Sequence, residues 1–557
     1  MKKPAVIGLM VVLLGCMSAL WSQDEVVQSR APLVPRITSV DQLVPFAKII
    51  LQRDFIGQRL GWSIKGGERV LFKTSSSHHP WVTEAFIRAL RELNCEVDVV
   101  IRDRPFAMLG FDGLGGKQVS NEEWAKQVID MIEDRLSQDF NKKPNKNYGF
   151  GSAGGPLLGE PGIGLTEESA KYYDVIVGGG NPVGGLSGVH AWTTPELLAS
   201  VGTVYPGEIM DLIDAKAWAI IRNAEWVEIT DLQGSEASFT WHPEWWEIIE
   251  GTHPTIKVPG YESTFGSLRP GRSEYADFAG HIGGAPRYGA IEQTDFKGYL
   301  TGEIAQLGLV PIMTLWHDRG ELTRIDGGNY YGDMWREALN LTRDIQYPGY
   351  PRPGTGWMME FAFGTNPKII GPMEVEELKG DPQRDPAKIS WGFPRDREGA
   401  LHAGYGTLGA SWWGMLMDMP VNHFHLHLMF TTYIVHTRDG QSVKLVDRGH
   451  FTVIDDPEVR ALAAKYGDPD KVLKTDWVPG MTEDGKLIAP KSRMVSYEEF
   501  IANMPFRIDD PRLTYEYSHP HLDALYGKER MQYYNPEQYL EFYRKLGQIP
   551  VKRVQVN

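Results

Sequence analysis

The feature that most constrains this chain is the run from Asn422 to Phe430, in which His423, His425 and His427 alternate with apolar residues. The next five residues, 431–435, are rich in β-branched and aromatic side chains, so the whole run predicts one β-strand. Alternate side chains of a strand share a face, with Cα atoms roughly 6.6 Å apart, and two such imidazoles can bind one ion. We interpret the run as a metal-ligand strand. The competing interpretation is a strand that lines a polar cleft or pairs with carboxylates.

Length and charge narrow the classes of protein that fit. A chain of 557 residues is too long for one simple core and predicts roughly two to four domains. Its 17 Trp and 23 Tyr indicate large buried or cleft-lining aromatic surfaces. The 57 Lys and Arg against 72 Asp and Glu give a net charge of -15, which disfavours nucleic acid as a partner.

The first 22 residues predict export. A charged start, Met1 to Lys3, precedes a short apolar run at 5–14, as in a bacterial secretion signal, and the run is too short to predict a membrane span. The stretch Leu13 to Cys16 resembles a lipobox, whereas cleavage near Ser22 is the alternative. We expect a periplasmic protein or an outer-membrane lipoprotein that contacts the membrane only through an N-terminal lipid anchor.

Cysteine usage excludes two kinds of stabilisation. The chain has 2 cysteines, Cys16 and Cys95, and Cys95 has no partner if Cys16 is lipidated or removed. We therefore expect neither a disulfide framework nor a cysteine-based metal site.

An α/β domain is predicted over residues 41–230. It contains a β-α-β pattern, with a strand at 67–73, an amphipathic helix at 81–93 and a second strand at 96–101. A further buried strand is predicted at 173–177.

A β-rich domain is predicted over residues 231–475, because short β-like runs rich in Trp, Tyr and Gly replace the alternating pattern. Within it we expect a hairpin at 312–325 with Asp-Arg-Gly at its turn, followed by a helix at 326–340. Residues 476–557 are predicted to form a C-terminal extension.

The candidate ligands of the β-rich domain are one carboxylate and four imidazoles: Glu360, His402, His423, His425 and His427. A buried carboxylate in the apolar frame around Glu360 is unfavourable unless it is paired or metal-bound, and pairing with Arg352 or Lys368 is the alternative. Two His and one carboxylate suit a non-haem Fe(II) oxygenase, whereas His with several carboxylates suits hydrolytic zinc or two-metal sites.

Residues 234–440 resemble the thermophilic metallo-aminopeptidases (the aminopeptidase T/S family, M29) and the related 2,5-dihydroxypyridine dioxygenases. The matching motifs keep a common order: Gly298-Tyr299-Leu300, Ile325 to Gly328, Glu360 with Gly364, Asn366 and Pro367, His402 to Gly406, His425-Leu426-His427, and Asp439-Gly440. The resemblance implies an N-terminal α/β domain followed by a β-rich metal-binding domain of the aminopeptidase T/S type.

The departures from these families concern their metal ligands. The families have a His-x-Asp pair where this chain has His425 and His427. At the position of Glu360 the peptidases also have Glu, whereas the dioxygenases have His. The peptidases also use a Glu in a Gly-Glu-Val-Phe-Thr stretch, which we match to 288–292, where Ala290 replaces it. Their acidic residue five positions before His402 is Arg397 here. Since a two-metal hydrolase needs such carboxylates, we favour one metal ion.

Our hypothesis from the sequence is a mononuclear Fe(II) site held by Glu360, His425 and His427. His402 is a fourth ligand or the acid/base, and His423 or Tyr405 is a proton donor. Open metal positions suit ring cleavage of a small hydroxylated aromatic or heteroaromatic substrate.

Two other functions stay open. One is an exported Zn(2+) or Co(2+) aminopeptidase that recruits Glu292 or Glu398. The other is a non-catalytic metal- or ligand-binding lipoprotein. The family resemblance also suggests a homodimer.

Overall fold

The computed structural model describes residues 27–53, 64–75, 79–102, 126, 129–130, 133, 136–137, 172–178, 194–240, 275–277, 295–305, 308–347, 352–381, 384, 393–406, 423–514, 521 and 552–553. The predicted signal sequence, 1–22, lies outside these residues. No helix in the described part of the chain combines the length and apolarity needed to cross a bilayer.

The N-terminal region contains a parallel three-stranded sheet in the order β3-β2-β4, which confirms the β-α-β prediction. Its elements are β2 (Arg69–Ser75), α3 (Pro80–Glu92), β3 (Glu96–Arg102) and β4 (Val175–Gly178). Neighbouring parallel strands need a crossover, and α3 provides it between β2 and β3. The buried positions of α3 repeat every three or four residues, at Val82, Ala85, Phe86, Ala89 and Leu90, so one stripe of the helix is apolar.

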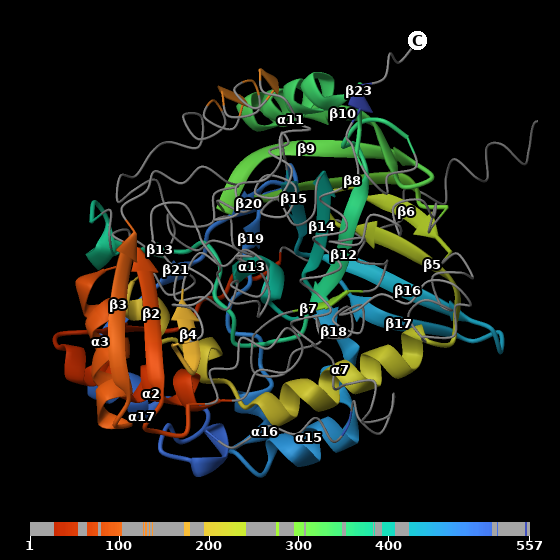
Figure 1. Cartoon of the computed structure of the whole chain (residues 1–557). Coiled ribbons are helices and arrows are strands. Elements are labelled where there is room, and N and C mark those ends of the chain that lie inside the picture. The colour runs from red at the N-terminus through yellow and green to blue at the C-terminus, as the bar shows by residue number, and fades with distance from the viewer. Residues whose placement is uncertain are drawn as a thin grey trace, which may run out of the picture.

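A second, much larger sheet has 12 strands and runs in the order β18-β17-β16-β5-β6-β8-β15-β14-β12-β7, with β9 and β10 added beside β8. Its strands are β5 (Ala224–Asp231), β6 (Glu236–Phe239), β7 (Tyr275–Asp277), β8 (Lys297–Ala305), β9 (Gly308–Asp318), β10 (Glu321–Gly327), β12 (Met358–Gly364), β14 (Leu401–Gly406), β15 (His423–Leu428), β16 (Thr431–Thr437), β17 (Ser442–Asp447) and β18 (His450–Phe451). Every pairing in it is antiparallel, and the sheet curls around itself in Figure 1. The fold is therefore mixed α/β, as the sequence predicts.

The predicted hairpin and helix are both present. β9 and β10 meet at Arg319 and Gly320, whose φ angles of 52° and 77° suit a tight hairpin turn. After β10, α11 (Asn329–Thr342) begins and lies along β9 (Figure 1). At Gly328, where φ is 78°, a Cβ would lie 2.7 Å from the backbone of Gly332, so the entry to the helix requires glycine.

Residues 423–435 of the predicted strand form two strands, which corrects the prediction of a single one. β15 pairs with β14 and β8, whereas β16 pairs with β5 and β17. The break is fixed by Asp231, whose carboxylate accepts hydrogen bonds from the Phe430 amide (3.1 Å) and the Thr431 hydroxyl (3.3 Å). Periodicity alone does not reveal a carboxylate that comes from a distant strand.

Two helices beside the large sheet, and a pair of short strands that are far apart in the sequence, complete the main fold. α7 (Gly207–Ile221) and α15 (Pro457–Ala463) pack against each other beside β16 and β17 (Figure 1). Residue 230, the predicted end of the α/β domain, lies inside β5. The N-terminal strand β1 (Val34–Arg36) pairs in parallel with β22 (Met494–Ser496), so the segment predicted as a C-terminal extension contacts the start of the described chain.

The remaining elements are short. They are α2 (Val44–Gln52), α6 (Pro195–Leu198), α13 (Phe393–Asp396), α16 (Pro469–Val472), α17 (Tyr497–Ala502), β11 (Ile345–Gln346), β13 (Glu374–Val375), β19 (Gly480–Met481), β20 (Leu487–Ile488), β21 (Lys491–Ser492), β23 (Lys552–Arg553), and the 3-10 helices η1 (Val40–Gln42), η4 (Gly202–Val204), η5 (Glu376–Leu378), η6 (Thr452–Asp455) and η7 (Pro511–Leu513).

Candidate metal centre

Two neighbouring strands bring three of the predicted site residues together. β14 and β15 are antiparallel, and their register places His402 directly opposite His427. His425 is two residues before His427 on β15, so its side chain lies on the same face. Its partner across the ladder is Gly404, which has no side chain to occupy that face.

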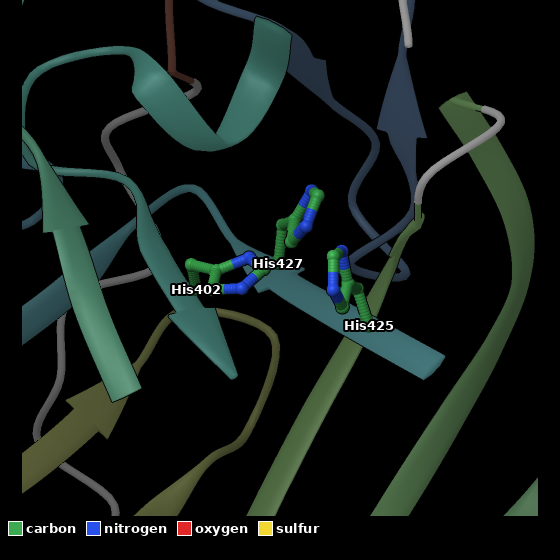
Figure 2. A group of neighbouring side chains, drawn as sticks. All are labelled: His402, His425 and His427. Carbon is green, nitrogen blue, oxygen red and sulfur yellow. The ribbon is translucent and has the colours of Figure 1, made fainter. Parts of the chain in front are cut away.

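The three imidazoles form one compact group. Each ring offers one nitrogen, and the three nitrogens lie within 4.8 Å of one another. The ring of His402 is 4.2 Å from that of His425 and 4.9 Å from that of His427, centroid to centroid. Figure 2 shows the three labelled side chains grouped together beside the strands that carry them. All three side chains are completely buried.

Burial and donor chemistry both fit a metal ion. Three imidazolium charges within a few ångströms, away from water, would repel one another and lose their hydration, so the group favours neutral rings. Neutral imidazole is a common ligand of Zn, Cu, Fe and Ni ions, and three His ligands leave further coordination positions open. Among the described residues this is the one His, Cys, Asp or Glu cluster with ligand spacing.

Two other predicted site residues are placed by their backbone alone. Glu360 in β12 pairs with Gly404, so the register places Glu360, Gly404 and His425 in one row across three strands. His423 pairs with Gly406 at the end of the same ladder. The side chains of Glu360 and His423 lie outside the described part of the structure, and their roles stay predictions.

Tyr405 is not brought to the histidine cluster. It is three residues after His402 on β14 and lies on the opposite face, where its hydroxyl is 2.7 Å from Nε2 of His317 on β9. Trp335 of α11 packs against the Tyr405 ring at 5.3 Å. Burial raises the pKa of Tyr405 and lowers the pKa of His317 to about 3, so a neutral phenol meets a neutral imidazole.

Glu398, which the peptidase hypothesis recruits, is engaged elsewhere. Its carboxylate is buried and accepts hydrogen bonds from the Phe451 amide (2.7 Å) and the Thr475 hydroxyl. Its neighbour Arg397 donates to the carbonyls of Met429 and Gly449, just beyond β15. Both residues therefore support the corner after the histidine strand. Glu292, the other recruited residue, lies outside the described residues.

Sequence reasoning missed one buried carboxylate on the strand next to the histidine strand. Glu303 is in β8, the strand that pairs with β15 through Ile304 and His427. It is 6% exposed, accepts a hydrogen bond from the Leu487 amide, and burial raises its pKa. The overlooked signal is Gly302-Glu303-Ile304, which keeps the Gly-Glu pair of the peptidase stretch that we matched to 288–292.

Comparison with known proteins gives distant structural neighbours. No protein-family model matches the chain, and no curated protein matches it. Among solved structures, 2,5-dihydroxypyridine dioxygenase from Pseudomonas putida KT2440 aligns with a TM-score of 0.39 and 13% identity, over 74% of this chain and 98% of that one. Wild-type AmpT from Thermus thermophilus aligns with a TM-score of 0.33 and 11% identity, over 74% and 99%. At these scores the chemistry of the site has to be argued from its own residues.

Proposed function

We propose that the chain is a metal-dependent enzyme whose single transition-metal ion is held by His402, His425 and His427. The observation that carries this proposal is the convergence of three fully buried imidazoles from two adjacent strands. His402 thereby takes a place in the ligand set equal to that of the two strand histidines. Glu360 is a further candidate ligand from β12.

The donor set supports a mononuclear oxygenase more than a hydrolase that needs two ions. A two-metal site uses carboxylates to bridge its ions and to activate water, and Glu398 is already engaged with Phe451 and Thr475. Three neutral imidazoles leave the full charge of a divalent ion uncompensated, which favours an anionic, chelating substrate. We infer Fe(2+) as the metal and oxidative ring cleavage of a small hydroxylated aromatic or heteroaromatic molecule as the reaction.

The residues of the chain have separate tasks in this proposal. His402, His425 and His427 bind the ion, and the packed strands hold their rings on one face and exclude water from them. Bound iron would supply Lewis acidity and one-electron chemistry toward oxygen. Gly404 keeps the face beside His425 open. His423 stays the candidate proton donor from this ladder.

Metal content tests the proposal. The protein without residues 1–22, the predicted signal sequence, is purified anaerobically, and iron, zinc and cobalt are measured per chain by elemental analysis. We expect about one iron per chain, followed by oxygen uptake with dihydroxylated rings. Metal uptake with neither oxygen consumption nor peptide hydrolysis would identify a non-catalytic binding protein instead.

Glu360 is tested separately from the histidines. In a Glu360→Gln variant, a direct ligand would lower iron affinity, whereas a carboxylate that only pairs with a cation would leave the ratio of iron to chain unchanged. His423→Gln is the matched comparison on the same face of the ladder. If it lowers turnover at constant iron content, His423 acts as a proton donor.

Glu303 favours a second candidate, a two-metal aminopeptidase. It would supply a buried carboxylate from the strand beside β15, as the resembled peptidases use in their Gly-Glu-Val-Phe-Thr stretch. This candidate predicts about two zinc or cobalt ions per chain and hydrolysis of an aminoacyl-nitroanilide without oxygen. Loss of one of two ions in Glu303→Gln would support it and overturn the mononuclear site.

A further inference from the structure

The strands do not hold the three histidines of the metal centre equally. His402 lies between two neighbouring strands, since β14 pairs with β12 at Ala362 and with β15 at His427. His427 also lies between two strands, because it faces His402 on one side and Ile304 of β8 on the other. A ladder on both edges fixes the backbone of a strand and, through the backbone, the position of each ring.

His425 lies where one of the supporting strands ends. On one edge it faces Gly404 of β14. On the other edge β8 ends at Ala305, one residue beyond the pair that Ile304 makes with His427. In an antiparallel pair the position opposite His425 would be two residues beyond Ile304, past this end of the strand. In the described part of the chain, the ladder with β8 therefore stops short of His425.

A helix meets the same edge at His425. Tyr331, in the first turn of α11, is fully buried, and its hydroxyl donates a hydrogen bond to the His425 carbonyl at 3.0 Å. The carbonyl of His427 lies against Gly302 and so points toward β8. Carbonyls two residues apart in a strand point to the same edge. Tyr331 therefore contacts β15 on the edge along which β8 runs.

The start of α11 is built for this close approach. Gly332 follows Tyr331, and a Cβ at this glycine would collide with the last carbonyl of β10. One turn later Trp335 packs on Phe424, the residue before His425. Neighbouring residues of a strand point to opposite faces, so the helix packs on the face away from the imidazoles. Tyr331 thus acts on the backbone of His425 and not on its ring.

We propose that Tyr331 is a positioning residue for His425 and that the metal affinity of the centre depends on its hydroxyl. The proposal rests on the three-histidine site proposed above. A ligand ring has to stay within about 0.5 Å of its place to share an ion with two others. Loss of the Tyr331 hydrogen bond would free the strand to shift at His425, and the ring would shift with it.

Tyr331→Phe tests the proposal because it removes the hydroxyl and keeps the ring. Co(2+) is titrated into the metal-free full chain, and we measure its Kd and the visible absorption of the bound ion, which reports its ligand geometry. We expect Tyr331→Phe to bind Co(2+) about 10-fold more weakly, with an altered spectrum. An unchanged Kd and spectrum would overturn the proposal and leave the metal centre intact. A wild-type chain that binds no Co(2+) would instead refute the metal centre itself.

Tyr405→Phe is the matched control. It also removes one buried hydroxyl from the face away from the histidine cluster, but that hydroxyl bonds to His317 and not to a metal-ligand residue. We expect Tyr405→Phe to keep the Kd and the spectrum of the wild type. An equal loss of affinity in the two variants would show that any lost hydrogen bond in this core weakens metal binding. That result would overturn a specific role for Tyr331.

A second measurement applies if Tyr331→Phe folds poorly. A metal that binds only the folded chain raises the free energy of unfolding by an amount set by its concentration and its Kd. Urea unfolding with and without excess Co(2+) therefore compares affinities even when a variant is less stable. A Kd that is about 10-fold weaker lowers this gain by about 1.4 kcal/mol. An equal gain in Tyr331→Phe and the wild type would overturn the proposal.

Discussion

Buried histidines lie against both faces of β14 and β15, in opposite roles. On one face His402, His425 and His427 point at one another. On the other face His317 meets the hydroxyl of Tyr405 at 2.7 Å, beneath Trp335 of α11. Burial is nearly equal on the two faces, with exposures of 0% for the three and 6% for His317. What separates a ligand set from a core histidine is therefore convergence on a common point, and burial alone does not distinguish them.

The largest effect should come from the converging face. His425→Ala or His427→Ala should lower metal affinity by more than about 100-fold, because each removes a ligand rather than a supporting contact. Elemental analysis per chain measures the loss, and circular dichroism checks that the fold remains. His317→Gln is the matched control from the other face and should keep its metal. Full metal content in both Ala variants would show that the converging histidines are not a ligand set, so that the two faces would not differ in metal binding.

The opposite face should determine stability instead. Trp335 is fully buried and packs on both Tyr405 and Phe424. Trp335→Ala should lower the free energy of unfolding by about 3–5 kcal/mol, since it leaves a large cavity. Urea unfolding measures the change, and the folded fraction should still bind metal with the normal ratio. A loss of metal at unchanged stability would reverse the assignment of the two faces.

The sequence predicts only part of this two-sided arrangement. Alternation predicted that His425 and His427 share a face, and β-α-β patterning predicted the parallel sheet around β2. The pairing of His402 with His427 depends on which strands become neighbours, and no local pattern encodes that. The break at Phe430 depends on Asp231, about 200 positions earlier. The sequence predicts Tyr405 as a candidate proton donor within the motif His402 to Gly406, but three residues along a strand place it on the other face.

The pH dependence of stability should distinguish His317 from an exposed histidine. Burial lowers its pKa to about 3 from an ordinary 6.5, so the folded protein keeps it neutral while the unfolded chain protonates it below about 6.5. Its contribution to stability is therefore complete above about pH 6.5 and decreases as the pH falls toward 3, by up to about 1.4 kcal/mol per pH unit. Urea unfolding of wild type and His317→Gln at pH 7, 6 and 5 should show a shallower slope in the variant. Parallel slopes would mean that His317 is not held neutral.

The smallest predicted effect separates packing from catalysis at Tyr405. Tyr405→Phe keeps the ring against Trp335 but removes the hydroxyl that bonds to His317, which should lower stability by about 1 kcal/mol. Because the ring lies on the face away from the histidine cluster, the ratio of metal to chain and the turnover should stay unchanged. A proton donor at this position would instead lower turnover at constant metal content. A packing role changes stability alone, whereas a proton-donor role changes turnover at constant metal content. Tyr405→Phe therefore decides which of the two roles Tyr405 has.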